Sequence, residues 1–362
     1  MKKNILATAV AALVAVPFAA SADTTLFGQI ETSVDALSAD SGANDSAIAL
    51  SSNSSRIGIK GAHDFGNGLK GIYHAEWGIA GTGDEKDLSQ RNRFVGLSGG
   101  FGTVLFGKHD TPLKIVGRKA DLFWSTQLGQ NRSLVAGQDN GVPGQGWDLR
   151  PNNVIAYVSP KLGPVTIIAA YVTDHTLAGA SAPIAENNDN DAVSVLAMGK
   201  VGPVFAAVGY EAHNISDAVK TALGAGETTA SAVRLTLSGD IGPIKLVGFY
   251  QDATDQGFLT GNDRTIYGLG AAFKSGSNTF KGQFYQADDN DLQGADSGAT
   301  LAAIGWDHSL SKSTAVYAQY AQVDNDKNAK FALGGAGHGS KTKPAVAGET
   351  VSGVSLGIRL KF

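Results

Sequence analysis

Short and long connections alternate along this sequence, and they join segments in which apolar and polar residues alternate. Stretches such as 56–60, 233–237 and 280–284 have the period of two that is typical of β-strands. Short connections lie at 66–68, 100–102, 162–164, 202–203, 242–243, 276–278 and 311–313, and long ones near 35–53, 80–90, 111–152, 174–190, 214–228, 252–262, 287–297 and 325–348. Seven short and eight long connections predict 16 strands.

This pattern predicts an all-β fold, a 16-stranded antiparallel transmembrane β-barrel. Strands of about ten residues with turns at one end and loops at the other are typical of such barrels. In hydrocarbon every backbone polar group needs an internal partner, so the strand near 24–34 must pair with the strand near 350–362. An even number of strands places both termini at the turn end, in the periplasm. A barrel of this size encloses a water-filled channel.

The first 22 residues read as a cleaved signal peptide and not as part of the fold. Lys2 and Lys3 precede a short apolar run, and Ala20-Ser21-Ala22 offers a cleavage site of the A-x-A type. Residues 23–362 then form a single barrel domain. The chain has no cysteine, so it has no disulfide framework. Its composition gives no sign of nucleic-acid binding.

The final strand shows the alternation most clearly. Leu356, Ile358, Leu360 and Phe362 share one face, and the cations at 359 and 361 share the other. The apolar row is expected to face lipid and the cations to face water. A terminal phenylalanine in this pattern resembles the outer-membrane assembly signal, so Phe362 is predicted to serve recognition by the barrel-assembly machinery.

The longest loop, 111–152, carries the densest charge and is predicted to fold into the barrel as a constriction. Its predicted pore-lining residues are Lys114, Arg118, Lys119, Asp121, Arg132 and Asp139. Apolar residues such as Leu122, Phe123 and Trp124 provide anchors that a loop lying free on the surface would not need. An ordered external loop is the alternative.

Several stretches together resemble the Gram-negative general porins of the neisserial and β-proteobacterial type. They are Arg93-Phe94-Val95-Gly96-Leu97-Ser98-Gly99-Gly100-Phe101-Gly102-Thr103-Val104, Phe106-Gly107-Lys108, Asp110-Thr111-Pro112, Asn152-Asn153-Val154-Ile155-Ala156-Tyr157-Val158-Ser159-Pro160, Thr25-Leu26-Phe27-Gly28 and Arg359-Leu360-Lys361-Phe362. The resemblance extends over essentially the whole mature chain, and the loops between these stretches diverge.

This resemblance implies a homotrimer of 16-stranded barrels in the outer membrane, in contact with lipid and lipopolysaccharide. It also implies a third external loop that folds inward, with basic wall residues facing loop acids. By position the wall candidates are Arg56, Lys60 and Lys108. Alternation from Val104 and Phe106 turns Lys108 outward unless a bulge intervenes. The sequence departs from members with a Pro-Glu-Phe-Gly loop tip, because residues 137–141 read Gly-Gln-Asp-Asn-Gly instead.

The predicted function is passive diffusion of ions and small hydrophilic solutes, with a weak preference for anions. A substrate-preferring channel of the same fold is the binding alternative. An outer-membrane hydrolase and a soluble exported β protein are two further alternatives.

Gly96-Leu97-Ser98-Gly99-Gly100 matches the G-x-S-x-G motif, but a strand rather than a helix is predicted to follow it. The seven histidines form no zinc motif. We therefore expect no enzymatic activity, metal or cofactor.

Overall fold

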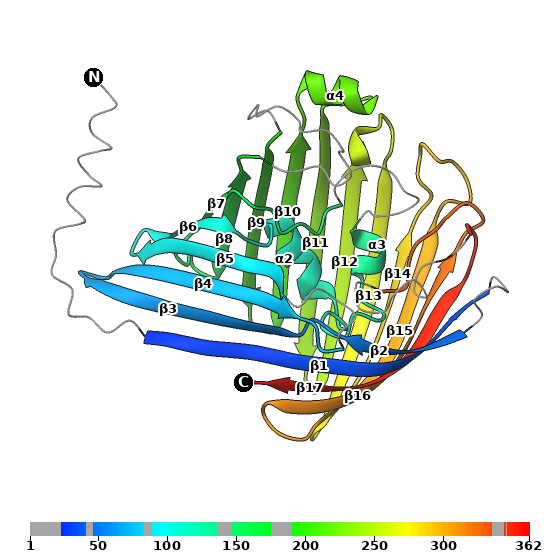
Figure 1. Ribbon diagram of the computed structural model, residues 1–362, viewed down its shortest axis with the longest axis horizontal. Coiled ribbons are helices and arrows are strands. Elements are labelled where there is room, and N and C mark those ends of the chain that lie inside the picture. Colours follow the sequence, from blue (N-terminus) through cyan, green and yellow to red (C-terminus); the bar gives the residue numbers. More distant parts are fainter. Residues whose placement is uncertain are drawn as a thin grey trace.

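Nearly all of the chain outside the loops belongs to one antiparallel sheet (Figure 1). The computed structural model describes residues 23–40, 46–82, 88–136, 146–174, 190–334, 344 and 346–362. No helix within these ranges is long and apolar enough to cross a membrane.

The strands follow one another around the sheet in chain order. They are β1 (Asp23–Ala39), β2 (Ser46–Ser52), β3 (Arg56–Gly66), β4 (Leu69–Ile79), β5 (Leu88–Gly99), β6 (Gly102–Lys108), β7 (Val154–Val158), β8 (Val165–Val172), β9 (Ala192–Val201), β10 (Val204–Asn214), β11 (Thr229–Ile241), β12 (Ile244–Thr254), β13 (Arg264–Ser275), β14 (Asn278–Ala287), β15 (Ala299–Ser309), β16 (Thr314–Asn325) and β17 (Val351–Lys361). The helices are α2 (Pro112–Ala120), α3 (Arg132–Val135), α4 (Asp217–Leu223) and the 3₁₀ turn η1 (Gln256–Phe258).

The sheet closes into a barrel because the first and last strands pair. β1 runs antiparallel to β17, from Gln29 opposite Lys361 to Ala39 opposite Val351. On its other side β1 pairs with both β2 and β3, which are therefore two halves of one barrel strand. Counted in this way the 17 strands make the predicted 16-stranded barrel, which is confirmed.

Residues 53–55 interrupt this second barrel strand. Ser54 has a positive φ of 52°, which a strand residue does not adopt. The Ser55 hydroxyl donates to the Glu31 carbonyl at 3.0 Å and accepts from the Glu31 N–H at 3.0 Å, so it replaces part of the lost ladder. After the interruption the chain continues in the same direction beside β1, and Arg56 begins a new register against that strand.

The seven predicted tight turns all join neighbouring strands. In the β3–β4 turn, Gly66, Asn67 and Gly68 all have positive φ, which glycine and asparagine tolerate. The longer connections lie at the other end of the strands, where α4 also lies (Figure 1). The first long connection is shorter than predicted, because β1 continues to Ala39 and β2 begins at Ser46.

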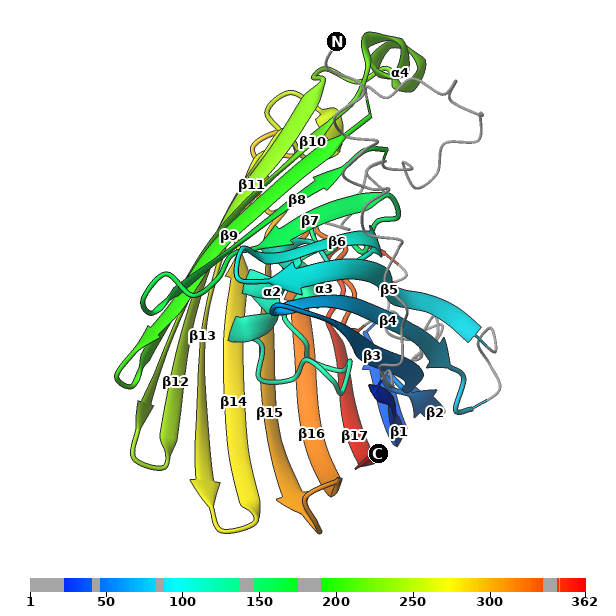
Figure 2. The same cartoon turned by 90° about the vertical axis from the view of Figure 1, so that its left-hand side faces the viewer.

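The two faces of the barrel wall differ in chemistry. On β17, Leu356, Ile358 and Leu360 are exposed, whereas Ser355 is buried on the opposite face. Side chains of the opposite face, such as Arg234 on β11 and Gln283 on β14, contact the loop between β6 and β7. Since these contacts come from strands around much of a closed barrel, the loop lies inside it (Figures 1 and 2). The exposed apolar row is therefore the outer surface.

Candidate functional site

Helix α2 opens the interior part of the β6–β7 loop, by which we mean the described residues 109–136 and 146–153. The Thr111 hydroxyl caps the helix by accepting from the Lys114 N–H at 3.4 Å, and Pro112 occupies the first turn. Its buried Val116 packs with Leu196 of β9 and Ala207 of β10. Helix α2 therefore covers the inner face of the wall at these strands.

A single buried arginine on β11 ties three parts of this loop together. Arg234 is fully buried and donates to the carbonyls of Leu113, at 3.3 Å, and Val135, at 2.7 Å. It also pairs with the Asp148 carboxylate at 2.5 Å. A Cβ on Gly117 would lie 2.7 Å from Arg234 Nη1, so a larger residue there would have to displace the guanidinium. Arg234 thus acts as a latch between the wall and the loop.

The distal part of the loop is fastened to strands farther round the barrel. Gln283 of β14 donates to the Gly129 carbonyl at 2.8 Å and to Asp121 at 3.0 Å. Arg359 of β17 donates to the Ser125 hydroxyl at 2.7 Å. Gln127 donates to the Ser54 hydroxyl at 3.2 Å, so the loop tip reaches the break in the second barrel strand.

A second anchor lies at the base of the loop, around a buried carboxylate. Asp110 lies 3.0 Å from Lys114 Nζ and 2.9 Å from Arg150 Nε. Burial alone would raise the pKa of Asp110, but the charges of Lys114 and Arg150 hold this pKa well below its usual range. Burial lowers the pKa of Lys114 to about 8, against the opposing effect of Asp110. This cluster fixes Arg150 beside the wall.

Two arginines of the barrel wall pair with the same carboxylate, on the face of the wall that lines the interior. Glu76 of β4 pairs with Arg91 of β5 and lies 3.9 Å from Arg56 Nε on β3. His74 Nε2 lies 3.8 Å from the same carboxylate. Burial lowers the pKa of Arg150, Asp110 opposes this, and the nearby charge of Arg91 lowers it further. Three guanidinium groups, those of Arg56, Arg91 and Arg150, therefore gather in one part of the pore wall.

The structure places four of the predicted cations on surfaces inside the barrel. Arg56 donates to the Ser54 carbonyl at 2.9 Å, which holds its guanidinium beside the break. Lys60 is exposed in the same strand row, with Nζ 5.3 Å from the Phe27 ring centre. Arg118 and Lys119 are exposed on α2 and lie over the rings of Trp124 and Phe205, at 5.2 and 6.0 Å.

The predicted inward position of Lys108 is wrong. Lys108 pairs with Arg93 in the row that also holds Phe106 and Val95, and both of these are exposed on the outer wall. Its Nζ donates to Asn152 at 3.0 Å. The bulge that would have reversed the alternation lies on β5 and not on β6, so Lys108 stays in the outward row.

Three predicted loop residues hold the loop in place more than they face water. Lys114 is buried in the pair with Asp110. Asp121 accepts from the N–H groups of Phe123 and Asn131 as well as from Gln283, and burial raises its pKa to about 6 despite these donors. Arg132 lies 3.6 Å from Asp148 and keeps part of its surface open. Asp139 lies outside the described residues.

Sequence reasoning did not assign Arg91, Glu76 and Arg150 to the site. The register of β4 against β5 shifts between Ala75 and Trp77, so residues 91 and 92 both stand opposite Glu76. Such a bulge turns Arg91 inward out of simple alternation, and no local motif announces it. Arg150 is one of the cations of the 111–152 loop, but the sequence does not show that it pairs with Asp110 in the folded protein.

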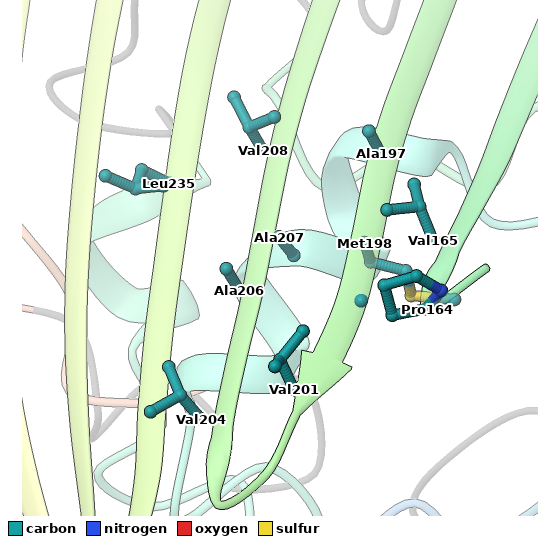
Figure 3. A pocket seen from close by; sticks show the side chains of 11 residues that line it. Pro164, Val165, Ala197, Met198, Val201, Val204, Ala206, Ala207, Val208 and Leu235 are labelled. Carbon is teal, nitrogen blue, oxygen red and sulfur yellow. The ribbon is translucent and has the colours of Figure 1, made fainter. Parts of the chain in front are cut away.

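An apolar groove on the outer wall has no part in this site. It has a volume of about 320 Å³ and lies over β8–β11 (Figure 3). Its lining residues are Pro164, Val165, Ala197, Met198, Gly199, Val201, Val204, Ala206, Ala207, Val208 and Leu235. Because these side chains offer no charge, the groove suits a hydrocarbon environment and not a hydrophilic solute.

Comparison with known proteins links this architecture to one family. A family profile described as Gram-negative porin matches residues 7–328. Outer membrane porin protein 32 of Delftia acidovorans is 32% identical to the chain, and the alignment covers 100% of both sequences. Major outer membrane protein P.IB of Neisseria gonorrhoeae is 34% identical over 38% of this chain and 40% of its own.

Solved structures show the same relationship. The structure described as an anion-selective porin from Comamonas acidovorans superimposes with a TM-score of 0.77 at 28% identity. That match covers 94% of this chain and 100% of the porin. The likeness therefore extends over the whole barrel.

Proposed function

Since the chain belongs to the Gram-negative porin family and is an outer-membrane diffusion channel, we propose that it passes small hydrophilic solutes with a preference for anions. Solutes cross down their gradients through the water-filled barrel, and no bond is made or broken. The β6–β7 loop (111–152) narrows this path, and the charges beside it set the field that selects ions.

The observation that carries the anion preference is the fate of the loop acids. All three acids in the described part of the loop are occupied: Asp110 by Lys114 and Arg150, Asp148 by Arg234 and Arg132, and Asp121 by backbone and amide donors. The paired acids therefore add little negative potential to the pore, whereas two cations of the wall share the single carboxylate of Glu76 and so leave an excess of positive charge. The anion-selective porin from Comamonas acidovorans, similar over the whole barrel, supports this direction.

Deeper in the interior the charges are closer to balance. Lys281 of β14 lies 3.0 Å from Asp307, and Arg359 lies 3.9 Å from the same carboxylate and 3.6 Å from Glu31. These pairs add little net charge, so the excess of cations around Arg56, Arg91 and Arg150 sets the sign of the field.

Measurement in a planar bilayer tests this function. Purified protein is expected to form open channels whose reversal potential in a KCl gradient takes the sign of the chloride equilibrium potential. A reversal potential of the opposite sign would overturn the anion preference, and failure to conduct would overturn the diffusion channel. Conductance that saturates with one organic anion would favour the substrate-preferring alternative.

Several further features of the proposal concern the mature protein and its partners. Cleavage after residue 22 leaves Asp23, the first residue of β1, as the mature N-terminus. The trimer, the contacts with lipid and lipopolysaccharide and the periplasmic position of both termini follow from the family and the even number of strands. The barrel wall and its outer apolar row are consistent with each of them.

A catalytic role finds no support around the G-x-S-x-G motif. Ser98 Oγ lies 2.8 Å from Thr103 Oγ1 across the turn between β5 and β6. The nucleophile elbow of hydrolases needs a helix directly after the serine, and here a strand follows. The proposed function is therefore that of a channel and not of an enzyme.

Removal of the terminal aromatic ring is expected to reduce assembly without changing the channel. Phe362 exchanges two backbone hydrogen bonds with Gly28, at 2.9 and 3.1 Å, and its ring covers that glycine on the outer wall. The Phe362→Ala variant keeps the backbone bonds and loses the ring that we assign to the assembly machinery. Folded porin in outer-membrane fractions should fall severalfold, with wild-type single-channel conductance. Normal yield, or a loss matched by Phe362→Tyr, would contradict the role of the ring.

A further inference from the structure

Aromatic rings form a chain across one sector of the barrel wall, and we call this chain the aromatic strip. Its members are Phe27 of β1, His74 of β4, Phe94 of β5 and His109 directly after β6. Along the strip, successive ring centres lie 5.1, 5.3 and 5.3 Å apart, and the second and third rings are stacked within 3° of parallel. The Phe27 ring reaches across β3 because Gly58 has no side chain there: a Cβ would lie 2.5 Å from Phe27 Cζ. The strip thus spans neighbouring strands (Figure 2).

The register of the strands places the strip on the inner face of the wall. Phe27 follows Leu26, and Phe94 precedes Val95. Those two neighbours are 58% and 62% exposed on the outer wall. Because successive strand residues point to opposite faces, Phe27 and Phe94 point inward. His74 is the register partner of Phe94 and shares its face. The strip therefore lines the pore.

The strip is partly open to the pore, whereas other aromatic residues of the interior are covered. Phe249 and Tyr285 are at most 5% exposed, since they belong to the apolar cluster that also contains the loop residues Phe123 and Leu134. All four rings of the strip are only partly buried. Apolar surface in contact with water is unfavourable, so open rings in a water-filled pore favour a solute that covers them.

Cations lie on both sides of the strip. Toward the loop end of the barrel, the guanidinium groups of Arg56 and Arg91 gather around Glu76, two residues along β4 from His74. Two strand residues span about 7 Å. A guanidinium carries more N–H donors than one shared carboxylate can occupy, so both arginines keep donors for a further anion. Toward the turn end, Lys60 Nζ lies 5.3 Å from the centre of the first ring of the strip.

We propose that the aromatic strip and the neighbouring guanidinium groups bind small aromatic carboxylates during their passage through the pore. The inference rests on the proposed function as an anion-preferring channel and names a class of solute for it. The ring of the solute stacks on the strip, and its carboxylate accepts from Arg56 or Arg91, whose planar groups match a carboxylate. Inorganic anions meet the same charges without the stacking, so they are retained less.

Three probes test this site in a planar bilayer. Benzoate has the ring and the charge, cyclohexanecarboxylate has the charge without an aromatic face, and benzamide has the ring without the charge. Each is added to channels that carry a chloride current, and the concentration that gives half of its maximal reduction of this current is measured. Contact between aromatic rings changes an affinity by roughly two- to tenfold. Benzoate is therefore expected to act at a severalfold lower concentration than either control.

The probes also define what would overturn the site. Equal potency of benzoate and cyclohexanecarboxylate would exclude recognition of the ring, and equal potency of benzoate and benzamide would exclude the role of the guanidinium groups. An unchanged chloride current in benzoate would exclude the site altogether. These comparisons use the unchanged protein, so they do not depend on the folding of any variant.

A matched pair of variants locates the site on the wall. Phe94→Leu removes one ring of the strip and should raise the half-effect concentration of benzoate severalfold. Phe205→Leu removes another inward, partly buried ring, on β10, which also has a cation over it, Lys119 at 6.0 Å. This control should leave the half-effect concentration unchanged. Equal effects of the two variants would overturn the assignment to the strip.

The same membranes separate this site from the channel itself. Conductance and reversal potential in KCl are recorded before any organic solute is added. Channels that prefer chloride but do not distinguish the three probes would count against the strip alone. Membranes without open channels, or with the reversal potential of a cation-selective pore, would count against the proposed function and, with it, against the site.

Discussion

Replacing Arg56 and Arg91 together by glutamine is expected to move the reversal potential in a salt gradient strongly toward the cation side. Both guanidinium groups share Glu76, and the double variant leaves this carboxylate as the dominant charge of the wall. A unit charge about 7 Å away in water contributes roughly 0.6 kcal/mol to the energy of an ion. Removing two of them should lower the ratio of anion to cation permeability by at least about tenfold.

Two further variants make this result specific. Glu76→Gln removes the shared carboxylate and should shift the ratio in the opposite direction. Lys312→Gln removes a cation from the tight turn between β15 and β16, far along the chain from the cluster, and should leave the ratio unchanged. Equal shifts for the turn variant and the wall variant would mean that net charge, and not the wall cluster, sets selectivity.

The second large effect is expected from the loss of the Arg234 latch. Arg234→Leu leaves the buried Asp148 carboxylate without its closest cation and frees the carbonyls of Leu113 and Val135. Breaking a buried ion pair in this way typically costs about 3–5 kcal/mol. We expect a released loop, seen as frequent closures in single-channel records, and a lower midpoint of thermal unfolding in detergent.

Matched variants separate the latch from a general effect of charge removal. Arg132→Leu removes the other cation near Asp148. Because Arg132 is about one third exposed and its Nε lies 3.6 Å from the carboxylate, only a small change in the midpoint of thermal unfolding is expected. Adding Asp148→Leu to Arg234→Leu removes the orphaned carboxylate and should restore part of the stability. Quiet, wild-type channels from Arg234→Leu would show that the loop is held by its apolar contacts alone.

Local sequence rules were sufficient for most of the barrel. Alternation and turn chemistry act over a few residues, so segments such as Leu356 to Leu360 and turns such as Gly66 to Gly68 could be assigned directly. The strand Ser46–Ser52 was missed and assigned to a loop, because the break at 53–55 separates it from the clear alternation that begins at Arg56, and Ser and Asn side chains replace the ladder hydrogen bonds to β1 at that break.

The site was less accessible from sequence because its contacts are long-range. Arg234 reaches residues 86 to 121 positions earlier in the chain, and no local pattern encodes such a bond. Arg91 and Lys108 show a second difficulty, because the side of the wall that a residue faces depends on bulges. A bulge on β5 turns Arg91 inward, whereas β6 pairs with β5 without a bulge and Lys108 stays outward. A shift of a single residue thus exchanges the two sides of the wall.

The interruption at residues 53–55 connects the two ways in which the pore selects solutes, by size and by charge. Ser54 accepts from Arg56 through its carbonyl and from Gln127 at the loop tip through its hydroxyl. A movement of the loop tip therefore changes the support of a wall arginine as well as the width of the passage. Exclusion by size and discrimination by charge should vary together, so a large solute that displaces the tip would also alter the permeability of small ions.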